Sequence, residues 1–259
     1  MIPRLYVPLL EPEDVVRHLG KQEKHWKQGR SAHALAYAWH DRIDFPPAID
    51  QALRTHGIFR SAQLIDGFFE RQTDLGSPGR PSQTDLLAII GVNDGLAILA
   101  VEGKAGEPFG KYVQQWRDGS DGKEPRLEGL CKILGLSPET AMPLRYQLLH
   151  RAASAILEAQ RYRAKTAALL VHSFSDDKNG FADFGAFLQA LGFEAPVPGI
   201  LAGPIVRDGV SLYAGWVQDE APPDESPGAY LDNLRGYAAK IAKECKRMRA
   251  WCDEQQSKR

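Results

Sequence analysis

The 259-residue sequence contains only three cysteines, Cys131, Cys245 and Cys252, and no Cys-x-x-Cys pair. An odd number of widely spaced cysteines does not provide a disulfide framework, and without histidines at finger spacing it does not provide a structural zinc site. We therefore expect a reduced, cytoplasmic chain.

Long apolar runs are also absent. The longest ones, such as LLAIIGV and LAILAV, are far shorter than the roughly 18 residues that a membrane-spanning helix requires. The first residues, MIPRLYVPLLEPEDVV, lack a basic segment followed by an apolar one. We therefore expect neither secretion nor membrane association.

The sequence has almost no net charge, because 32 basic residues are balanced by 33 acidic ones. A protein that holds nucleic acid by general electrostatic attraction carries a basic excess, which this chain lacks, although a local basic groove remains compatible with the composition. With 43% apolar residues, the chain is long enough to bury a large core. We expect one globular domain with additions.

Local patterns divide the chain into three parts. We predict an N-terminal helical extension at 1–55, a core at 56–219, and a linker followed by a C-terminal helix at 220–259. Within the core, residues 58–68 fit either a helix or a strand, because apolar residues recur every three positions while Gly67 disfavours a helix.

The clearest strand and helix patterns lie in the middle of the chain. Residues 84–104, TDLLAIIGVNDGLAILAVEGK, predict two apolar strands joined by a tight turn at NDG. After a long connection, 105–143, the best helix pattern occupies 145–163 and is followed by the apolar strand TAALLVHSF. A second hairpin is expected within 203–217. This succession predicts an α/β fold.

Charged residues at the open end of the first hairpin are the main functional signal. If the turn is a two-residue loop at Asp94-Gly95, Asp85 lies opposite Lys104. Directly opposed residues share a face of the sheet, as do Glu102 and Lys104, which are two apart on one strand. We therefore expect Asp85, Glu102 and Lys104 to converge at one end of one face.

Two interpretations of this cluster are open. Neighbouring carboxylates offer the hard oxygen ligands that Mg²⁺ prefers, and an adjacent lysine can orient or help deprotonate a water and neutralise charge on a phosphate. Alternatively, Asp85 and Lys104 form a surface salt bridge across the strand ends, which contributes about 0–1 kcal/mol to stability and performs no chemistry.

The order of Asp85, a strand, a turn, a strand ending in EGK, a helix and another strand resembles the PD-(D/E)XK (restriction-endonuclease-like) nuclease superfamily. The resemblance runs from near Ala62 to Phe174 and is particularly similar to the branch that includes archaeal Holliday-junction resolvases. It implies a core of helix, three strands, helix and strand, with a central mixed sheet flanked by helices. It also implies that Asp85 and Glu102 bind Mg²⁺ or Mn²⁺ and that Lys104 assists the water. Most of the chain also resembles an uncharacterised bacterial family within or near this superfamily.

The same resemblance implies roles for further residues. In several branches a glutamine early on the helix lies beside the metal, which corresponds to Gln147, and Arg151 on the same face could contact a phosphate. The alternative for both is a partly solvated helix face. Glu70 is a candidate third carboxylate, since some members carry an acidic residue on their first helix. Gly103, where an apolar residue is commoner, predicts a bulge or a close backbone approach.

Two other segments are candidates for substrate or partner contacts. The 105–143 connection could fold back over the site, where Lys111 or Arg126 would reach a substrate phosphate or remain a solvated charge. In the predicted C-terminal helix, Cys245 and Cys252 are seven residues apart and could line one seam. Such a seam would suit docking to the core or to a second subunit in a homodimer.

The leading hypothesis is a Mg²⁺- or Mn²⁺-dependent nuclease in which Asp85, Glu102, Lys104 and Gln147 form the catalytic set. Its partner would be nucleic acid, DNA rather than RNA, with no membrane. A rival from another class is a non-catalytic binding or regulatory module that kept the fold. A third possibility is an accidental resemblance, in which case the first hairpin would not lie beside the 145–163 helix.

Overall fold

In a computed structural model of the chain, the structure describes residues 9–20, 26–40, 43–93 and 95–221, together with positions 242, 245, 246, 248 and 249. The predicted linker and C-terminal helix therefore lie almost entirely outside the described residues. The chain divides into two units, Met1–Ala221 and Pro222–Arg259, and the sheet belongs to the first. In the described part, no helix has the length and apolar character needed to cross a membrane.

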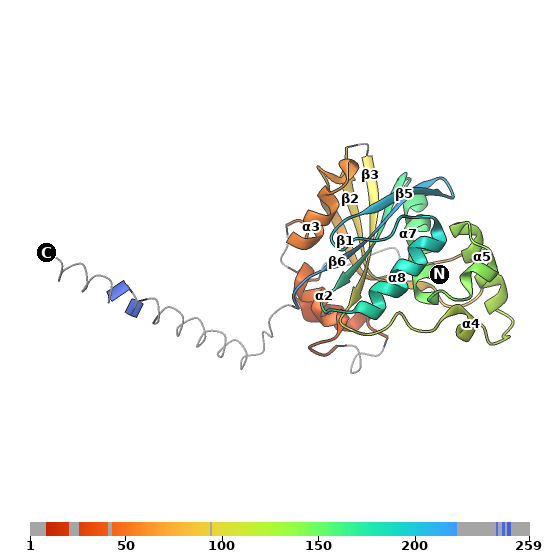
Figure 1. The fold of residues 1–259 in the computed structure, drawn as a ribbon, viewed down its shortest axis with the longest axis horizontal. Helices are drawn as coiled ribbons and strands as arrows, with labels where there is room; N and C mark the ends of the chain where they lie inside the picture. Colours follow the sequence, from red (N-terminus) through yellow and green to blue (C-terminus); the bar gives the residue numbers. More distant parts are fainter. Residues whose placement is uncertain are drawn as a thin grey trace. The chain divides into compact units, whose positions relative to one another are not determined.

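The first unit is an α/β fold built on one six-stranded mixed sheet (Figure 1). Its strands are β1 (Gln63–Thr73), β2 (Ser82–Val92), β3 (Gly95–Lys104), β4 (Thr166–Ser173), β5 (Ala202–Arg207) and β6 (Val210–Gln218). The spatial order is β1-β2-β3-β4-β6-β5, with β4 parallel to both β3 and β6 and the other pairs antiparallel. The predicted fold class, α/β with a mixed sheet flanked by helices, is confirmed.

Helices cover both faces of this sheet (Figure 1). The described helices are η1 (Pro12–His18), α2 (Ser31–Trp39), α3 (Pro47–Arg54), η2 (Gly57–Phe59), α4 (Val113–Trp116), α5 (Lys123–Leu134), α6 (Pro138–Ala141), α7 (Tyr146–Arg161) and α8 (Lys178–Leu191), of which η1 and η2 are 3-10 helices. The segment 58–68, which fits either a helix or a strand in sequence, contains the end of η2 and the first part of β1.

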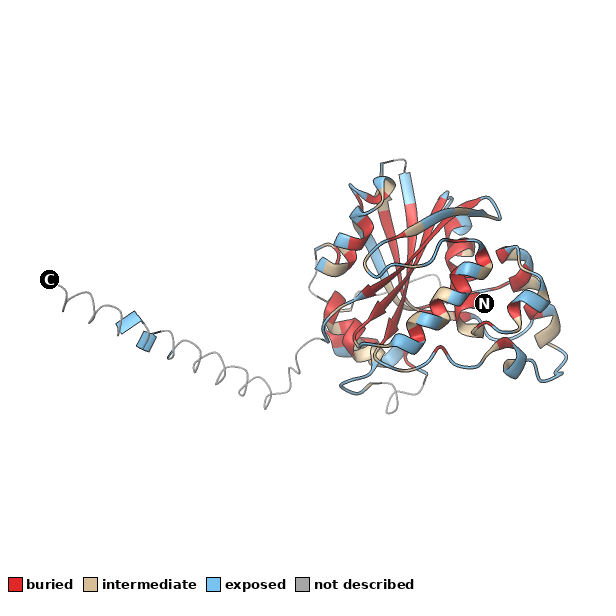
Figure 2. Ribbon diagram, viewed as in Figure 1, coloured by how far each residue is buried: buried red, intermediate tan, exposed pale blue. Residues whose placement is uncertain are grey.

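Side-chain alternation along the strands creates two apolar cores. On β2, Leu87 and Ile89 pack with α5, α7 and α8, whereas Leu86, Ala88 and Ile90 pack with α2 and α3. Figure 2 shows that buried residues fill the sheet and the helix faces turned toward it. The N-terminal helices α2 and α3 therefore complete the core on one face, and α7 lies on the other.

Helix α8 was not expected from the sequence. Its sequence, KNGFADFGAFLQAL, contains two glycines, and glycine in a helix interior costs roughly 1 kcal/mol relative to alanine. The helix nevertheless buries Phe184, Phe187, Leu188 and Leu191, which are spaced to form one face. Tertiary burial of this apolar face therefore outweighs the weak local propensity.

The first hairpin forms with a register two residues away from the expected one. Leu86 pairs with Val101, so Asp85 lies opposite Glu102 rather than Lys104. The difference arises because Val92 pairs with Gly95, so the two-residue loop lies one position earlier in the sequence than expected. A shift of two residues leaves every side chain on its original face. Asp85, Glu102 and Lys104 therefore still lie on one face of the sheet, although the predicted register was wrong.

Gly103 lies where α2 comes closest to the sheet. β3 stays in regular register with β4 through this position, so the paired residues contain no bulge there. A Cβ atom at Gly103 would lie 3.4 Å from Cβ of Ser31 and 3.5 Å from Cβ of Leu35. Of the two expectations for this glycine, the close backbone approach is therefore the correct one.

We expect Gly103→Ile to lower the free energy of unfolding by about 1–3 kcal/mol, because its branched side chain would force α2 away from the sheet. Gly103→Ala is the matched control and should cost less than about 1 kcal/mol, since its single added atom makes contacts at the limit of ordinary packing. Urea denaturation measures both changes. Equal stability of the two variants would contradict this explanation.

Candidate active site

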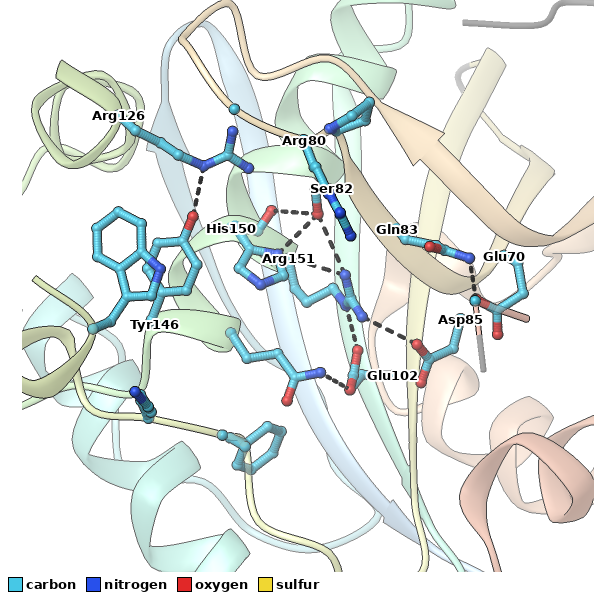
Figure 3. A pocket seen from close by; sticks show the side chains of 18 of the residues that line it. Glu70, Arg80, Ser82, Gln83, Asp85, Glu102, Arg126, Tyr146, His150 and Arg151 are labelled. Atoms are coloured by element: carbon cyan, nitrogen blue, oxygen red, sulfur yellow. Dashed lines mark hydrogen bonds and ion pairs between the residues drawn. The ribbon is translucent and has the colours of Figure 1, made fainter. Parts of the chain in front are cut away.

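The charged residues of the first hairpin line a large pocket at the carboxyl end of β3 (Figure 3). The pocket has a volume of about 1040 Å³ and also receives residues from β1, from the start of α7 and from the 105–143 connection. Ligands of open α/β sheets commonly bind outside the carboxyl ends of the parallel strands. The hairpin itself packs directly against α7. If the resemblance were accidental, the hairpin was not expected to lie beside this helix.

Three carboxylates stand in a row on three neighbouring strands. The pairing of β1 with β2 places Glu70 opposite Asp85, and the pairing of β2 with β3 places Asp85 opposite Glu102. Glu70 has a φ of 53°, in the left-handed region that non-glycine residues rarely adopt, and its carboxylate accepts a 2.7 Å hydrogen bond from Gln83. Glu70 therefore reaches the pocket from a strand, not from a helix as the resemblance implied.

Burial and crowding change the acidity of these carboxyl groups. Burial, together with the charge of Glu102, raises the pKa of Asp85 to about 7. Burial and the charge of Asp85 also raise the pKa of Glu70 well above its ordinary value. Burial alone would raise the pKa of Glu102, but the charges of Arg151 and Lys104 hold it below its ordinary value. The site therefore contains one firmly ionised carboxylate beside two that resist ionisation.

Arg151 of α7 lies between two of these carboxylates. Its Nη2 donates to Oδ1 of Asp85 over 3.1 Å, and its Nε donates to Oε2 of Glu102. Gln147, Arg151 and Ser154 follow one face of α7, as their spacing predicts. That face is turned toward the sheet, so the helix brings a cation to the carboxylates rather than to solvent.

Lys104 and Gln147 meet at the other oxygen of Glu102. The Nζ atom of Lys104 donates to Oε1 of Glu102 over 2.9 Å and to Oε1 of Gln147 over 3.2 Å. Nε2 of Gln147 donates to the same glutamate oxygen over 2.6 Å. Lys104 is only 3% exposed and pairs with Glu102. The alternative interpretation, a surface salt bridge between Lys104 and Asp85, is therefore wrong, because Lys104 is buried and its ion pair among the described residues is with Glu102.

The donor set fits a hard divalent cation in its chemistry. Asp85 and Glu102 offer carboxylate oxygens of the kind that Mg²⁺ and Mn²⁺ prefer. Burial, followed by the charge of Glu102, raises the pKa of Asp85. Both carboxylates are nevertheless engaged, since Oδ2 of Asp85 also accepts from the Gly103 amide over 3.0 Å. Over the described ranges, no three His, Cys, Asp or Glu side chains are grouped to hold a metal. Arg151 is the group that a metal would have to displace.

The opposite wall of the pocket consists mostly of residues that the sequence patterns did not identify. Trp116 stacks on Tyr146 with ring centroids 3.9 Å apart. Tyr146 accepts a 2.6 Å hydrogen bond from Arg126, and the Ser82 hydroxyl lies 2.8 Å from Nδ1 of His150. Two signals could have found this wall: the polar run SQTD that opens β2, and the spacing of four between Tyr146 and His150 on α7.

The chain matches the family described as Domain of unknown function (DUF6946) over residues 8–221. It belongs to this family. No curated protein and no solved structure matches the chain. The DUF6946 match includes all six strands of the sheet and every residue that lines the pocket.

Proposed function

We propose that this protein is a divalent-metal-dependent nuclease of the PD-(D/E)XK (restriction-endonuclease-like) type, which hydrolyses phosphodiester bonds. The observation that carries the proposal is the meeting of Asp85, Glu102, Lys104 and Gln147 in one pocket. The element order α3, β1, β2, β3, α7 and β4 supports it, because it agrees with the core that the resemblance implies. Helices α4 to α6 then belong to an inserted segment.

Asp85 and Glu102 would hold Mg²⁺ or Mn²⁺. Glu70 lines the same pocket but is not grouped with them as a third metal ligand. When bound, such an ion polarises a phosphoryl oxygen and lowers the pKa of water. Lys104 would orient the attacking water and neutralise negative charge that develops on the phosphate. Because Gln147 bonds to both Lys104 and Glu102, it fixes the ammonium group relative to the carboxylate.

Arg151 would exchange one negative partner for another during this reaction. Its guanidinium now bonds to Asp85 and Glu102, which come from different strands. A substrate phosphate offers the paired oxygen acceptors that suit a guanidinium group. Release of Asp85 would therefore leave Arg151 able to bind the phosphate without becoming an isolated buried charge.

A panel of end-labelled DNA and RNA, single- and double-stranded, tests the proposal in Mg²⁺, Mn²⁺ or EDTA. We expect metal-dependent cleavage, of DNA in preference to RNA, that is lost in EDTA and in Glu102→Gln. Asp50→Asn is the matched control, since Asp50 pairs with Arg54 on α3 and does not line the pocket. Cleavage that persists in EDTA or in Glu102→Gln would contradict the proposal.

A non-catalytic binding or regulatory module is the second candidate, and Arg151 is the observation that favours it. Arg151 is 6% exposed and bonds to both Asp85 and Glu102, so the network pairs these carboxylates with a protein cation. A buried network of this kind can specify a packing arrangement without performing chemistry.

Arg151→Met separates the two candidates. In both cases the metal-free variant is expected to lose about 3–5 kcal/mol of stability, because buried carboxylates lose their partner. If the carboxylates form a metal site, Mn²⁺ should raise the Tm of the variant more than that of the wild type, since binding to the native state stabilises it. If the network is only structural, the Tm should not respond to Mn²⁺.

Thermal unfolding with and without Mn²⁺ measures this difference, and Arg145→Met provides the matched control. Arg145 forms a 2.7 Å ion pair with Asp183 and does not line the pocket. Its replacement should lower the Tm without creating a response to Mn²⁺. A response of equal size in both variants would remove the evidence for a specific site.

A further inference from the structure

Arg126 of α5 is a buried cation whose hydrogen-bond partners in the described part of the chain are all neutral. It is 8% exposed, its Nε donates to the Tyr146 phenol over 2.6 Å, and its Nη1 donates to the carbonyl of Pro78 over 3.3 Å. Its Nη2 makes no hydrogen bond to the described residues. Burying a cation without a counter-ion is unfavourable. The position is therefore suited to an anion that arrives from outside the chain.

The loop before β2 closes on this guanidinium from one side. Gly79 has a φ of 110°, and a Cβ atom there would lie 3.1 Å from Nη1 of Arg126. Figure 3 shows Arg126 extending from its helix into the pocket, on the side away from Glu70 and Asp85. The absence of a side chain at Gly79 thus allows the loop backbone to contact the guanidinium while Arg126 still lines the pocket.

Other cations line the same pocket. Arg80 and Lys111 both line it, and neither forms an ion pair with a described carboxylate. His150 lies between Arg126 and Asp85 in Figure 3, and burial followed by the charge of Arg151 holds its pKa well below the usual value. The pocket is therefore lined by the cations Arg80, Lys111 and Arg126 as well as by carboxylates, and Figure 3 shows Arg126 on the side away from Glu70 and Asp85.

We propose that Arg126, with Arg80 and Lys111, forms an anion subsite for a second phosphate of the nucleic-acid strand whose scissile phosphodiester faces the carboxylates. This inference rests on the proposed function and deepens it. A backbone phosphate and a terminal phosphate share the chemistry that the guanidinium recognises. By fixing one phosphate, the subsite determines which neighbouring bond of the strand reaches the carboxylates.

Binding of single-stranded DNA in EDTA, which removes divalent metal and so isolates binding from cleavage, tests the subsite. The probe is an oligonucleotide with a 3′ fluorescein label and either a 5′-phosphate or a 5′-hydroxyl, followed by fluorescence anisotropy. Arg126→Gln should weaken binding by about tenfold or more, as expected for a lost hydrogen bond to a charged group. It should also reduce the slope of log K against log salt by about 0.7, the value for one phosphate contact on a single strand.

The two oligonucleotides distinguish the source of the phosphate. A loss confined to the 5′-phosphorylated strand assigns the subsite to a terminal phosphate, and an equal loss with both strands assigns it to the backbone. Arg117→Gln is the matched control, because Arg117 lies in the same segment, pairs with Glu124 and does not line the pocket. It should change the affinity by less than about twofold, as is usual for an exposed ion pair.

Unchanged affinity and slope in Arg126→Gln, an equal loss in Arg117→Gln, or no DNA binding by the wild type would each overturn the subsite. If Arg126→Gln does not fold, the double variant Arg80→Gln, Lys111→Gln replaces it, and an unchanged salt slope there would overturn the proposal too. Failure of the nuclease proposal gives a different result. DNA binding that depends on Arg126 without any cleavage would contradict the nuclease proposal and support the subsite. Cleavage that does not depend on Arg126 would contradict only the subsite.

Discussion

Cleavage of a phosphodiester substrate is expected to fall by at least about 10³-fold when Asp85 is replaced by asparagine. The amide offers one neutral carbonyl oxygen in place of a carboxylate, which would weaken the proposed binding of metal by Asp85 and Glu102. Metal assistance contributes several kcal/mol to lowering the barrier, and each 1.36 kcal/mol corresponds to about a factor of ten in rate. Single-turnover cleavage with enzyme in excess measures the chemical step directly.

Lys104→Met and Asp50→Asn complete this experiment. Lys104→Met should reduce the cleavage rate by about 10²-fold or more while leaving metal affinity measurable, because the ammonium group stabilises charge without being a metal ligand. Asp50→Asn should retain the wild-type rate, since Asp50 lies outside the pocket. An Asp85→Asn protein that keeps more than about a tenth of the wild-type rate would contradict the role assigned to Asp85.

The same Asp85→Asn substitution is expected to make the metal-free protein more stable at pH 8. Burial and the charge of Glu102 raise the pKa of Asp85 to about 7, whereas the unfolded chain releases this proton near pH 4. Between these values the native state holds more protons than the unfolded state, so the free energy of unfolding falls as the pH rises. This decrease in the free energy of unfolding is complete above about pH 7. An asparagine at position 85 does not titrate, so the variant does not undergo this decrease.

We expect a gain of about 2 kcal/mol for Asp85→Asn at pH 8 that disappears near pH 4. Urea denaturation in EDTA at both pH values measures the difference, with Asp50→Asn as the control that should show no such dependence. A variant that is less stable than the wild type at pH 8 would contradict the assigned pKa. Loss of activity together with increased stability is the pattern expected of a functional carboxylate rather than a structural one.

Much of the site could be predicted because short-range spacing determines which residues share a face. The alternation of β2 and β3 placed Asp85 on the same face as Glu102 and Lys104, and the wrong register by two residues did not change that result. Helical spacing likewise placed Gln147 and Arg151 on one face of α7. These predictions depend only on the period of each element.

The remaining features depend on which elements meet in space. Spacing on α7 could not show that Arg151 bonds to carboxylates on two strands, because that contact depends on how the helix crosses the sheet. Arg126 is close to Tyr146 only because α5 packs against α7 and the loop at Gly79 closes over it. From the sequence, Arg126 could be either a phosphate contact or a solvated charge. Its burial depends on tertiary packing, which local spacing does not determine.

Calorimetric titration of Mn²⁺ into the full chain at pH 8 tests most directly whether Asp85 and Glu102 form a metal site. We predict saturable binding by the wild type and by Asp50→Asn, with binding lost in both Asp85→Asn and Glu102→Gln. Absence of binding by the wild type at millimolar Mn²⁺, or wild-type binding by the two pocket variants, would contradict the metal site on which the proposed function depends.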